Sequence, residues 1–140
     1  PNPKIGLLSN GEEEGKGNLL AQATYPLLKA NSHIHFIGNI EGRDLLTDKA
    51  DVMVCEGFTG NIIMQMAESL CDISRQRQVK VDFFSRFNFE NYGGTPVLGV
   101  AKPVIIGHGI SGAKAFMNMI HLAQLMIEKE VMQQMKEELA

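Results

Sequence analysis

The sequence predicts an α/β protein, in which helices cover a largely parallel β-sheet. Short apolar runs end in glycine-containing loops and are followed by apolar residues at helical spacing, and this order occurs three times along the chain. One run, residues 51–55, is nearly continuous in β-branched and apolar residues, which is typical of a strand buried on both faces of a parallel sheet. Ligands bind outside the carboxyl ends of such strands, where the glycine-containing loops fall.

The first half of the chain predicts a strand, a helix and a second strand. Residues 4–9 form a short apolar run that ends in an Asn-Gly turn. Residues 17–31 carry apolar side chains at helical spacing. Pro26 in their middle predicts a kink or a split helix, because proline cannot donate a main-chain hydrogen bond. Residues 33–38 predict the second strand.

The second half predicts a long helix, two short strands and a final helix. A helical pattern at residues 62–73 follows the strand at 51–55 through a loop. Residues 96–100 and 103–107 predict two short strands, and residues 111–138 predict the final helix. These elements complete the α/β order.

Composition excludes several classes of protein. The chain has 140 residues, room for about one domain, and 44% of them are hydrophobic, which excludes disordered and fibrous architectures. A net charge of −3 provides no overall reason to bind nucleic acid. Two cysteines, Cys55 and Cys71, cannot build a disulfide framework, and we expect both thiols to be buried in a protein of a reducing, cytoplasmic compartment. No apolar run approaches the ~20 residues of a membrane-spanning helix.

The first loop that could bind a ligand covers residues 10–18. Lys16 lies between Gly15 and Gly17 at the start of a helix, where amide N–H groups, the positive helix end and the ammonium can together hold an anion. The spacing is not that of a Walker A loop, and three glutamates at 12–14 would repel a nucleotide triphosphate. The alternative is a surface turn with a solvated acidic run.

The second loop, residues 56–61, follows the strand that we expect to be the most buried. Gly57 and Gly60 allow the main chain to approach a ligand closely, and the Asn61 amide can both donate and accept hydrogen bonds. The alternative is a turn into the helix with Thr59 or Asn61 as its N-cap.

The third loop covers residues 107–112. His108 lies between Gly107 and Gly109, so we expect an accessible, mobile imidazole that could donate to an oxyanion or exchange protons near neutral pH. Ser111 is expected to cap the final helix, because the spacing differs from that of a nucleophile elbow. No spacing of His, Cys and carboxylates in the chain argues for a metal.

One further segment, residues 75–89, interleaves basic and apolar side chains. The basic residues are Arg75, Arg77, Lys80 and Arg86. Cations are favoured after a helix C-terminus by the helix dipole. The alternative is a basic, apolar rim for an acidic protein or a lipid surface.

Five blocks of sequence, in this order, resemble the bacterial phosphate acyltransferase family, the PlsX-type fatty acid/phospholipid synthesis proteins. The blocks are residues 11–18, 37–44, 50–61, 92–99 and 108–111. The resemblance implies a three-layer α/β/α sandwich of the isocitrate/isopropylmalate dehydrogenase type, usually as a homodimer. It also implies that residues 1–140 are the C-terminal part of a single α/β domain, the N-terminal half being absent.

The resemblance implies transfer of a fatty acyl group from acyl carrier protein to inorganic phosphate, giving acyl phosphate for phospholipid synthesis without a cofactor. Two alternatives stay open: a phosphotransacetylase-type enzyme that uses an acyl-CoA thioester, and a non-catalytic dimerisation module. A dehydrogenase of the related fold would need a nucleotide-binding pattern, and none is evident. The interval between the blocks ending at Asn61 and beginning at Tyr92 is shorter than in many family members, so any contact with a membrane surface is expected to be weak.

Phosphate is already a competent nucleophile, so this reaction needs position and charge balance rather than a Ser or Cys nucleophile. The hypothesis is that Lys16 holds phosphate, that Asn61 orients phosphate or the thioester carbonyl, and that His108 stabilises the tetrahedral oxyanion or protonates the departing thiolate. The substrate-binding residues would be Gly15, Gly17, Asn18, Gly57, Gly60, Gly107, Gly109 and Ser111. This hypothesis requires the three loops to converge in space.

Overall fold

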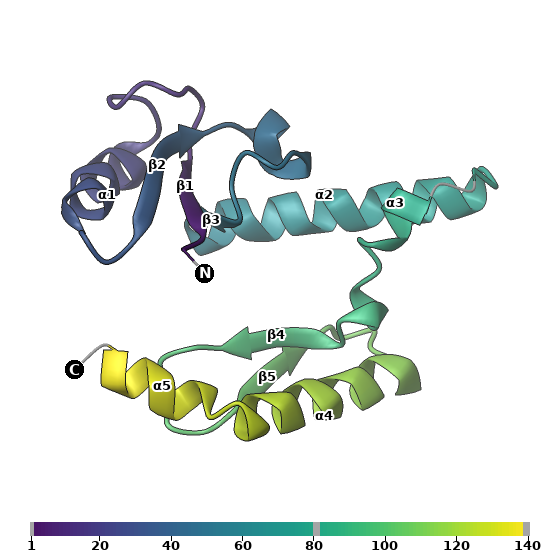
Figure 1. Ribbon diagram of the computed structural model, residues 1–140. Coiled ribbons are helices and arrows are strands. Elements are labelled where there is room, and N and C mark those ends of the chain that lie inside the picture. The colour runs from purple at the N-terminus through teal and green to yellow at the C-terminus, as the bar shows by residue number, and fades with distance from the viewer. Residues whose placement is uncertain (1, 80–81, 139–140) are drawn as a thin grey trace. The chain divides into compact units, whose positions relative to one another are not determined.

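The computed structural model describes residues 2–79 and 82–138 (Figure 1). The chain divides into two compact units, residues 1–63 and 64–140, and each is described by itself.

The first unit is built on a parallel sheet, as the sequence predicts. Its strands are β1 (Lys4–Leu8), β2 (His35–Ile40) and β3 (Val52–Val54). Their order is β2-β1-β3, so β1 pairs in parallel with both neighbours, and Leu7 lies opposite Asn39 on one side and Val54 on the other. Because the strands are parallel, the loops that follow them lie at one edge of the sheet.

The core of this unit lies where β1 meets β2. Leu7 and Ile40 are buried, and a Cβ atom at Gly6 would lie only 2.7 Å from the Ile40 side chain. The expected burial of the third strand on both faces is wrong, because β3 is an edge strand here and Val52 is exposed. Cys55, in the loop just after β3, is likewise exposed rather than buried.

One helix, α1 (Leu19–Ala30), packs beside β2 (Figure 1). Tyr25 and Phe36 make an edge-to-face ring contact at 5.2 Å between centroids. Asn18 caps the helix by accepting a hydrogen bond from the Ala21 amide at 2.8 Å. Pro26 does not split the helix, since the cap and the contact with β2 hold both of its halves.

A short 3-10 helix, η1 (Gly42–Leu46), follows β2, and the long α2 (Gly57–Gln76) follows β3. The sequence pattern places the start of the long helix five residues late, since its apolar face is not yet evident in the Gly-rich first turn. Cys71 of α2 is buried, as predicted.

The second unit joins a β-hairpin to two helices. Its further elements are α3 (Asp82–Ser85), η2 (Phe89–Asn91), β4 (Gly94–Val97), β5 (Val104–Gly107), α4 (Ala113–Glu128) and α5 (Val131–Glu138). β4 and β5 pair antiparallel in a sheet of their own, an arrangement that the prediction of one largely parallel sheet does not include. The few residues between them allow a hairpin but no crossover connection.

The predicted final helix is two helices. α4 ends at Glu128, and Glu130 has a φ of 49°, a left-handed conformation that interrupts helical geometry before α5 begins. Gly93, just before β4, has a φ of 85°, and a Cβ atom there would lie 2.5 Å from the Met119 amide nitrogen. Glycine at this position therefore lets the chain touch the backbone of α4.

Within the described ranges, no helix is both long enough and apolar enough to cross a membrane.

Candidate functional site

The glycine-rich loop between β1 and α1 is closed by its own main chain. The Asn10 side-chain oxygen accepts from the Gly17 amide at 2.8 Å, and the Lys16 amide donates to the Glu13 carbonyl at 3.0 Å. Gly17 has a φ of 101°, and a Cβ atom there would lie 2.9 Å from the Ser9 hydroxyl oxygen. Both its conformation and the space around it therefore require glycine.

Lys16 presents an unpaired ammonium on this loop. Its aliphatic stem lies against Gly11, where a Cβ atom would come within 2.8 Å of the Lys16 Cγ. Lys16 is exposed, and no hydrogen bond or ion pair engages its ammonium within residues 2–79 and 82–138. The ammonium is therefore free to meet an anion.

The adjacent acidic run is less repulsive than the sequence suggests. Glu12 pairs with Lys49 at 2.5 Å, and Glu14 pairs with Lys29 at 2.8 Å. Two of the three carboxylates next to Lys16 are thus balanced by lysines that lie elsewhere in the chain.

Two buried polar atoms lie beneath the loop at the carboxyl end of the sheet. Asn39 is only 4% exposed, and its amide nitrogen donates to the Glu13 carbonyl at 2.7 Å, while its Oδ1 has no partner among the described residues. The Ser9 hydroxyl is also buried, and no residue in the described ranges bonds to it. Neither residue was among the predicted site residues, although a polar side chain within the apolar second strand was a usable signal.

The N-terminus of α2 is occupied by a carboxylate from the chain itself. Glu56 accepts hydrogen bonds from the Phe58 amide at 2.6 Å and the Thr59 amide at 2.9 Å, and also from the Thr59 hydroxyl. The bond from the Thr59 hydroxyl, and then the Thr59 amide, lower the pKa of Glu56 from its ordinary value. The alternative in which Thr59 or Asn61 caps this helix is wrong, since Glu56 takes that role and Asn61 lies exposed within α2.

Residues of the first two loops line one small cavity in the first unit. Its volume is about 150 Å³, and its wall includes Asn18 from the first loop, Glu56 and Thr59 from the second, and Leu8 from β1. Cys55 also lines it, and partial desolvation of its thiol, followed by the nearby charge of Glu56, raises the pKa of this thiol although the residue as a whole is exposed. Gly60 approaches the same cysteine, since its Cβ atom would lie 3.1 Å from the sulfur.

His108 follows β5 in the second unit. Its Nε2 lies 3.3 Å from a carboxylate oxygen of Glu68, and its ring lies 4.5 Å from that of Phe89 between centroids. The side chain is 40% exposed, so it is accessible as expected, but it is packed rather than free. With Arg86 and Tyr92 it lines a cavity of about 350 Å³.

The turn after His108 does not cap the final helix through Ser111. The Ser111 amide donates to the His108 carbonyl at 3.0 Å, and its hydroxyl is buried without a partner in the part of the chain that the structure describes. Gly112 occupies the N-cap position of α4 and makes no side-chain bond. Gly107 lies close to Met119, whose sulfur would be 2.8 Å from a Cβ atom there.

The basic segment after α2 packs partly on itself. Arg75 pairs with Asp72 at 3.5 Å, and the Arg86 guanidinium lies 5.5 Å from the centre of the Phe83 ring. Lys80, which the sequence analysis includes in this segment, lies outside the described residues.

The predicted site residues divide between the two units. Lys16, its flanking glycines, Asn18, Gly57, Gly60 and Asn61 belong to the first unit, and Gly107, His108, Gly109 and Ser111 belong to the second. The first unit is a parallel α/β unit with a glycine-rich, lysine-bearing loop at the carboxyl edge of its sheet, the edge where proteins of this class bind ligands.

Comparison with known proteins places the chain in a family. A family model described as "Fatty acid synthesis protein" matches residues 1–80 and 76–134, and the chain belongs to that family. It is 45% identical to the phosphate acyltransferase of Aquifex aeolicus over 87% of this chain and 42% of that protein. It is 43% identical to the phosphate acyltransferase of Dictyoglomus turgidum, over 93% and 44%. The phosphate acyltransferase of Nitratidesulfovibrio vulgaris is 40% identical, over 91% and 43%. The chain thus spans less than half the length of these relatives.

Proposed function

We propose that this chain is part of an acyltransferase that moves a fatty acyl group from acyl carrier protein to inorganic phosphate, giving acyl phosphate for phospholipid synthesis. The observation that carries the proposal is the exposed ammonium of Lys16 on a closed glycine-rich loop, an ammonium that has no partner among the residues that the structure describes. The names of the relatives support the same reaction class.

In the proposed reaction, a phosphate oxygen attacks the thioester carbonyl carbon. A carbon–oxygen bond forms, the carbon–sulfur bond breaks, and the departing thiolate takes up a proton. Lys16 and the amides of its loop hold phosphate, and Asn61 orients phosphate or the carbonyl. His108, already near the carboxylate of Glu68, stabilises the oxyanion or protonates the thiolate.

The substrate-binding part of the proposal rests on glycines that keep the main chain accessible. It includes Gly15, Gly17, Asn18, Gly57, Gly60, Gly107, Gly109 and Ser111. It requires the two units to belong to one domain, a three-layer α/β/α sandwich similar to isocitrate/isopropylmalate dehydrogenase. We place the protein in the cytoplasm as a homodimer, with at most weak contact to a membrane surface.

The test is phosphate-dependent consumption of a thioester by the complete native protein. Acyl carrier protein and coenzyme A thioesters of the same acyl chain are compared side by side, with formation of acyl phosphate as the readout. Faster turnover of the carrier-protein thioester supports the proposal. Preference for the coenzyme A thioester would instead assign a phosphotransacetylase-type activity, and no turnover of either would leave the dimerisation module.

A further inference from the structure

Lys49, which is not among the predicted site residues, contacts the loop that carries Lys16 through an ion pair with Glu12. We propose that Lys49 is a positioning residue for phosphate binding: its ammonium holds and neutralises the Glu12 carboxylate, so that Lys16 is opposed by the Glu13 carboxylate and not by Glu12 as well. This inference rests on the proposed function, because it concerns the same phosphate.

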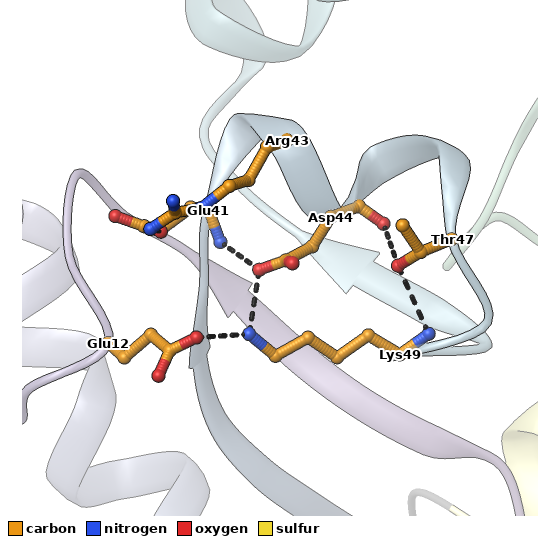
Figure 2. A network of polar contacts seen from close by, with 6 residues as sticks. All are labelled: Glu12, Glu41, Arg43, Asp44, Thr47 and Lys49. Atoms are coloured by element: carbon orange, nitrogen blue, oxygen red, sulfur yellow. Dashed lines mark hydrogen bonds and ion pairs between the residues drawn. The ribbon is translucent and has the colours of Figure 1, made fainter.

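Lys49 is anchored independently of the loop (Figure 2). Its main-chain amide donates to the Thr47 hydroxyl at 3.3 Å, and its ammonium donates to Asp44 at 2.8 Å. Asp44 is itself fixed, since it accepts a hydrogen bond from the Glu41 amide at 2.9 Å and its side chain is only 13% exposed. Lys49 therefore points at the loop from a preformed support on η1.

Electrostatics within this network agree with its geometry. The Glu41 amide, and after it the Lys49 ammonium, lower the pKa of the Asp44 carboxyl. Asp44, followed by Glu12, raises the pKa of Lys49. The lysine is thus charged and doubly paired at neutral pH. Glu41 is engaged separately by Arg43 (Figure 2).

Glu12 needs this partner because of where it lies. It follows Gly11, the residue on which the stem of Lys16 rests. An unpaired carboxylate there would repel phosphate and compete with it for the Lys16 ammonium. The Glu12 side chain is 62% exposed; Arg43 attracts it at longer range, and Lys49 makes the one ion pair to it among the contacts described for residues 2–79 and 82–138.

A second lysine–glutamate pair on the same loop provides a matched control. Lys29 and Glu14 lie 2.8 Å apart, but both side chains are 59% exposed, and within residues 2–79 and 82–138 no second carboxylate anchors Lys29. Pairs of this kind are screened by solvent and contribute little. Lys49, with an exposed fraction of 33%, is better shielded.

The experiment compares Lys49→Met with Lys29→Met in the complete native protein, by steady-state kinetics with phosphate varied at saturating acyl carrier protein thioester. Lys49→Met is expected to raise KM for phosphate about three- to tenfold and to leave kcat within about twofold. Lys29→Met is expected to leave both parameters near wild type. At 0.5 M salt the difference between wild type and Lys49→Met should shrink, because screening weakens the repulsion by Glu12.

Two further variants separate charge from folding. The double variant Glu12→Gln/Lys49→Met should recover most of the wild-type KM, since the carboxylate that Lys49 neutralises is gone. Lys49→Arg should also preserve KM. If Lys49→Met does not fold, the single variant Glu12→Gln tests the inference. A KM for phosphate equal to or below that of wild type supports the inference, and a raised KM for phosphate refutes it.

An unchanged KM in Lys49→Met, or a raised KM that Glu12→Gln does not recover, overturns the inference while leaving the proposed function intact. Failure of the proposed function has a different signature. In that case the wild-type protein itself shows no phosphate-dependent loss of thioester and no binding of inorganic phosphate by calorimetry.

Discussion

Among single residues, the charges of the first unit divide into paired and unpaired groups. Glu12 and Glu14 have lysine partners, whereas the ammonium of Lys16 has none within the described ranges. An exposed charge that makes no contact contributes little to folding, so its removal should change stability little. This contrast allows function and stability to be tested separately.

Lys16→Met is expected to lower kcat/KM for phosphate about tenfold to a hundredfold, the worth of a charge-assisted hydrogen bond. Its thermal unfolding midpoint should stay within about 2 °C of wild type, because no described contact is lost. Kinetics with varied phosphate and calorimetric unfolding measure the two effects. Full activity in this variant would remove Lys16 from the proposed site.

Glu56 carries a prediction about pH. Its pKa is lowered in the folded chain from an ordinary value of 4.5, mainly by the hydroxyl and amide of Thr59. The stabilisation is therefore complete above about pH 4.5 and is lost as the pH falls through the lower folded pKa. Between pH 7 and pH 3, the unfolding midpoint of Glu56→Gln should fall less than that of wild type. Glu137→Gln, which leaves the start of α2 unchanged, should follow wild type.

Among the helices and strands, the contact of α4 with the start of the hairpin depends on one glycine. Gly93 and Gly99 both have positive φ values, 85° and 78°, but only Gly93 lies against backbone atoms of α4. Both Gly93→Ala and Gly99→Ala therefore place an alanine in a strained conformation, and Gly93→Ala in addition brings its Cβ atom into steric overlap with the backbone of α4. We expect Gly99→Ala to cost about 1 kcal/mol of unfolding free energy and Gly93→Ala at least about 2 kcal/mol more. Denaturant unfolding measures the difference, and equal costs would contradict the close packing.

These elements also show where periodicity succeeds and fails. Apolar runs and spacing correctly placed β1, α1 and β3. β1 and α1 each bury one side chain, Leu7 and Ala21, whereas β3 was placed correctly although its expected burial was wrong. The same spacing predicted one helix where the structure has α4 and α5. Both helices carry apolar faces, and the left-handed conformation of Glu130 cannot be recognised from apolar spacing.

For the chain as a whole, an apolar face of α4 lacks a partner in the described structure. Phe116, Ile120 and Ile127 follow helical spacing and are exposed, while Ala115 and Met126 are buried. If the protein is the homodimer proposed above, this face is available to its interface. Ile120→Glu is then expected to raise the dissociation constant at least about tenfold, and His121→Glu, one residue further on, to change it little. Light scattering across a concentration series distinguishes the two, and equal effects would place the interface elsewhere.

Local residue order was sufficient for the strand–loop–helix succession, for the three glycine-containing loops and for the family resemblance, because turn residues and apolar spacing act over a few neighbouring positions. Only the tertiary structure shows which distant residues contact those loops. Lys49 meets Glu12, and Asn39 meets Glu13, across long stretches of chain. The hairpin pairing of β4 with β5 and the capping of α2 by Glu56 likewise depend on the path of the main chain. Residue spacing indicates on which face of a helix or strand a residue lies. It does not indicate which charged group or amide from a distant part of the chain lies beside that residue.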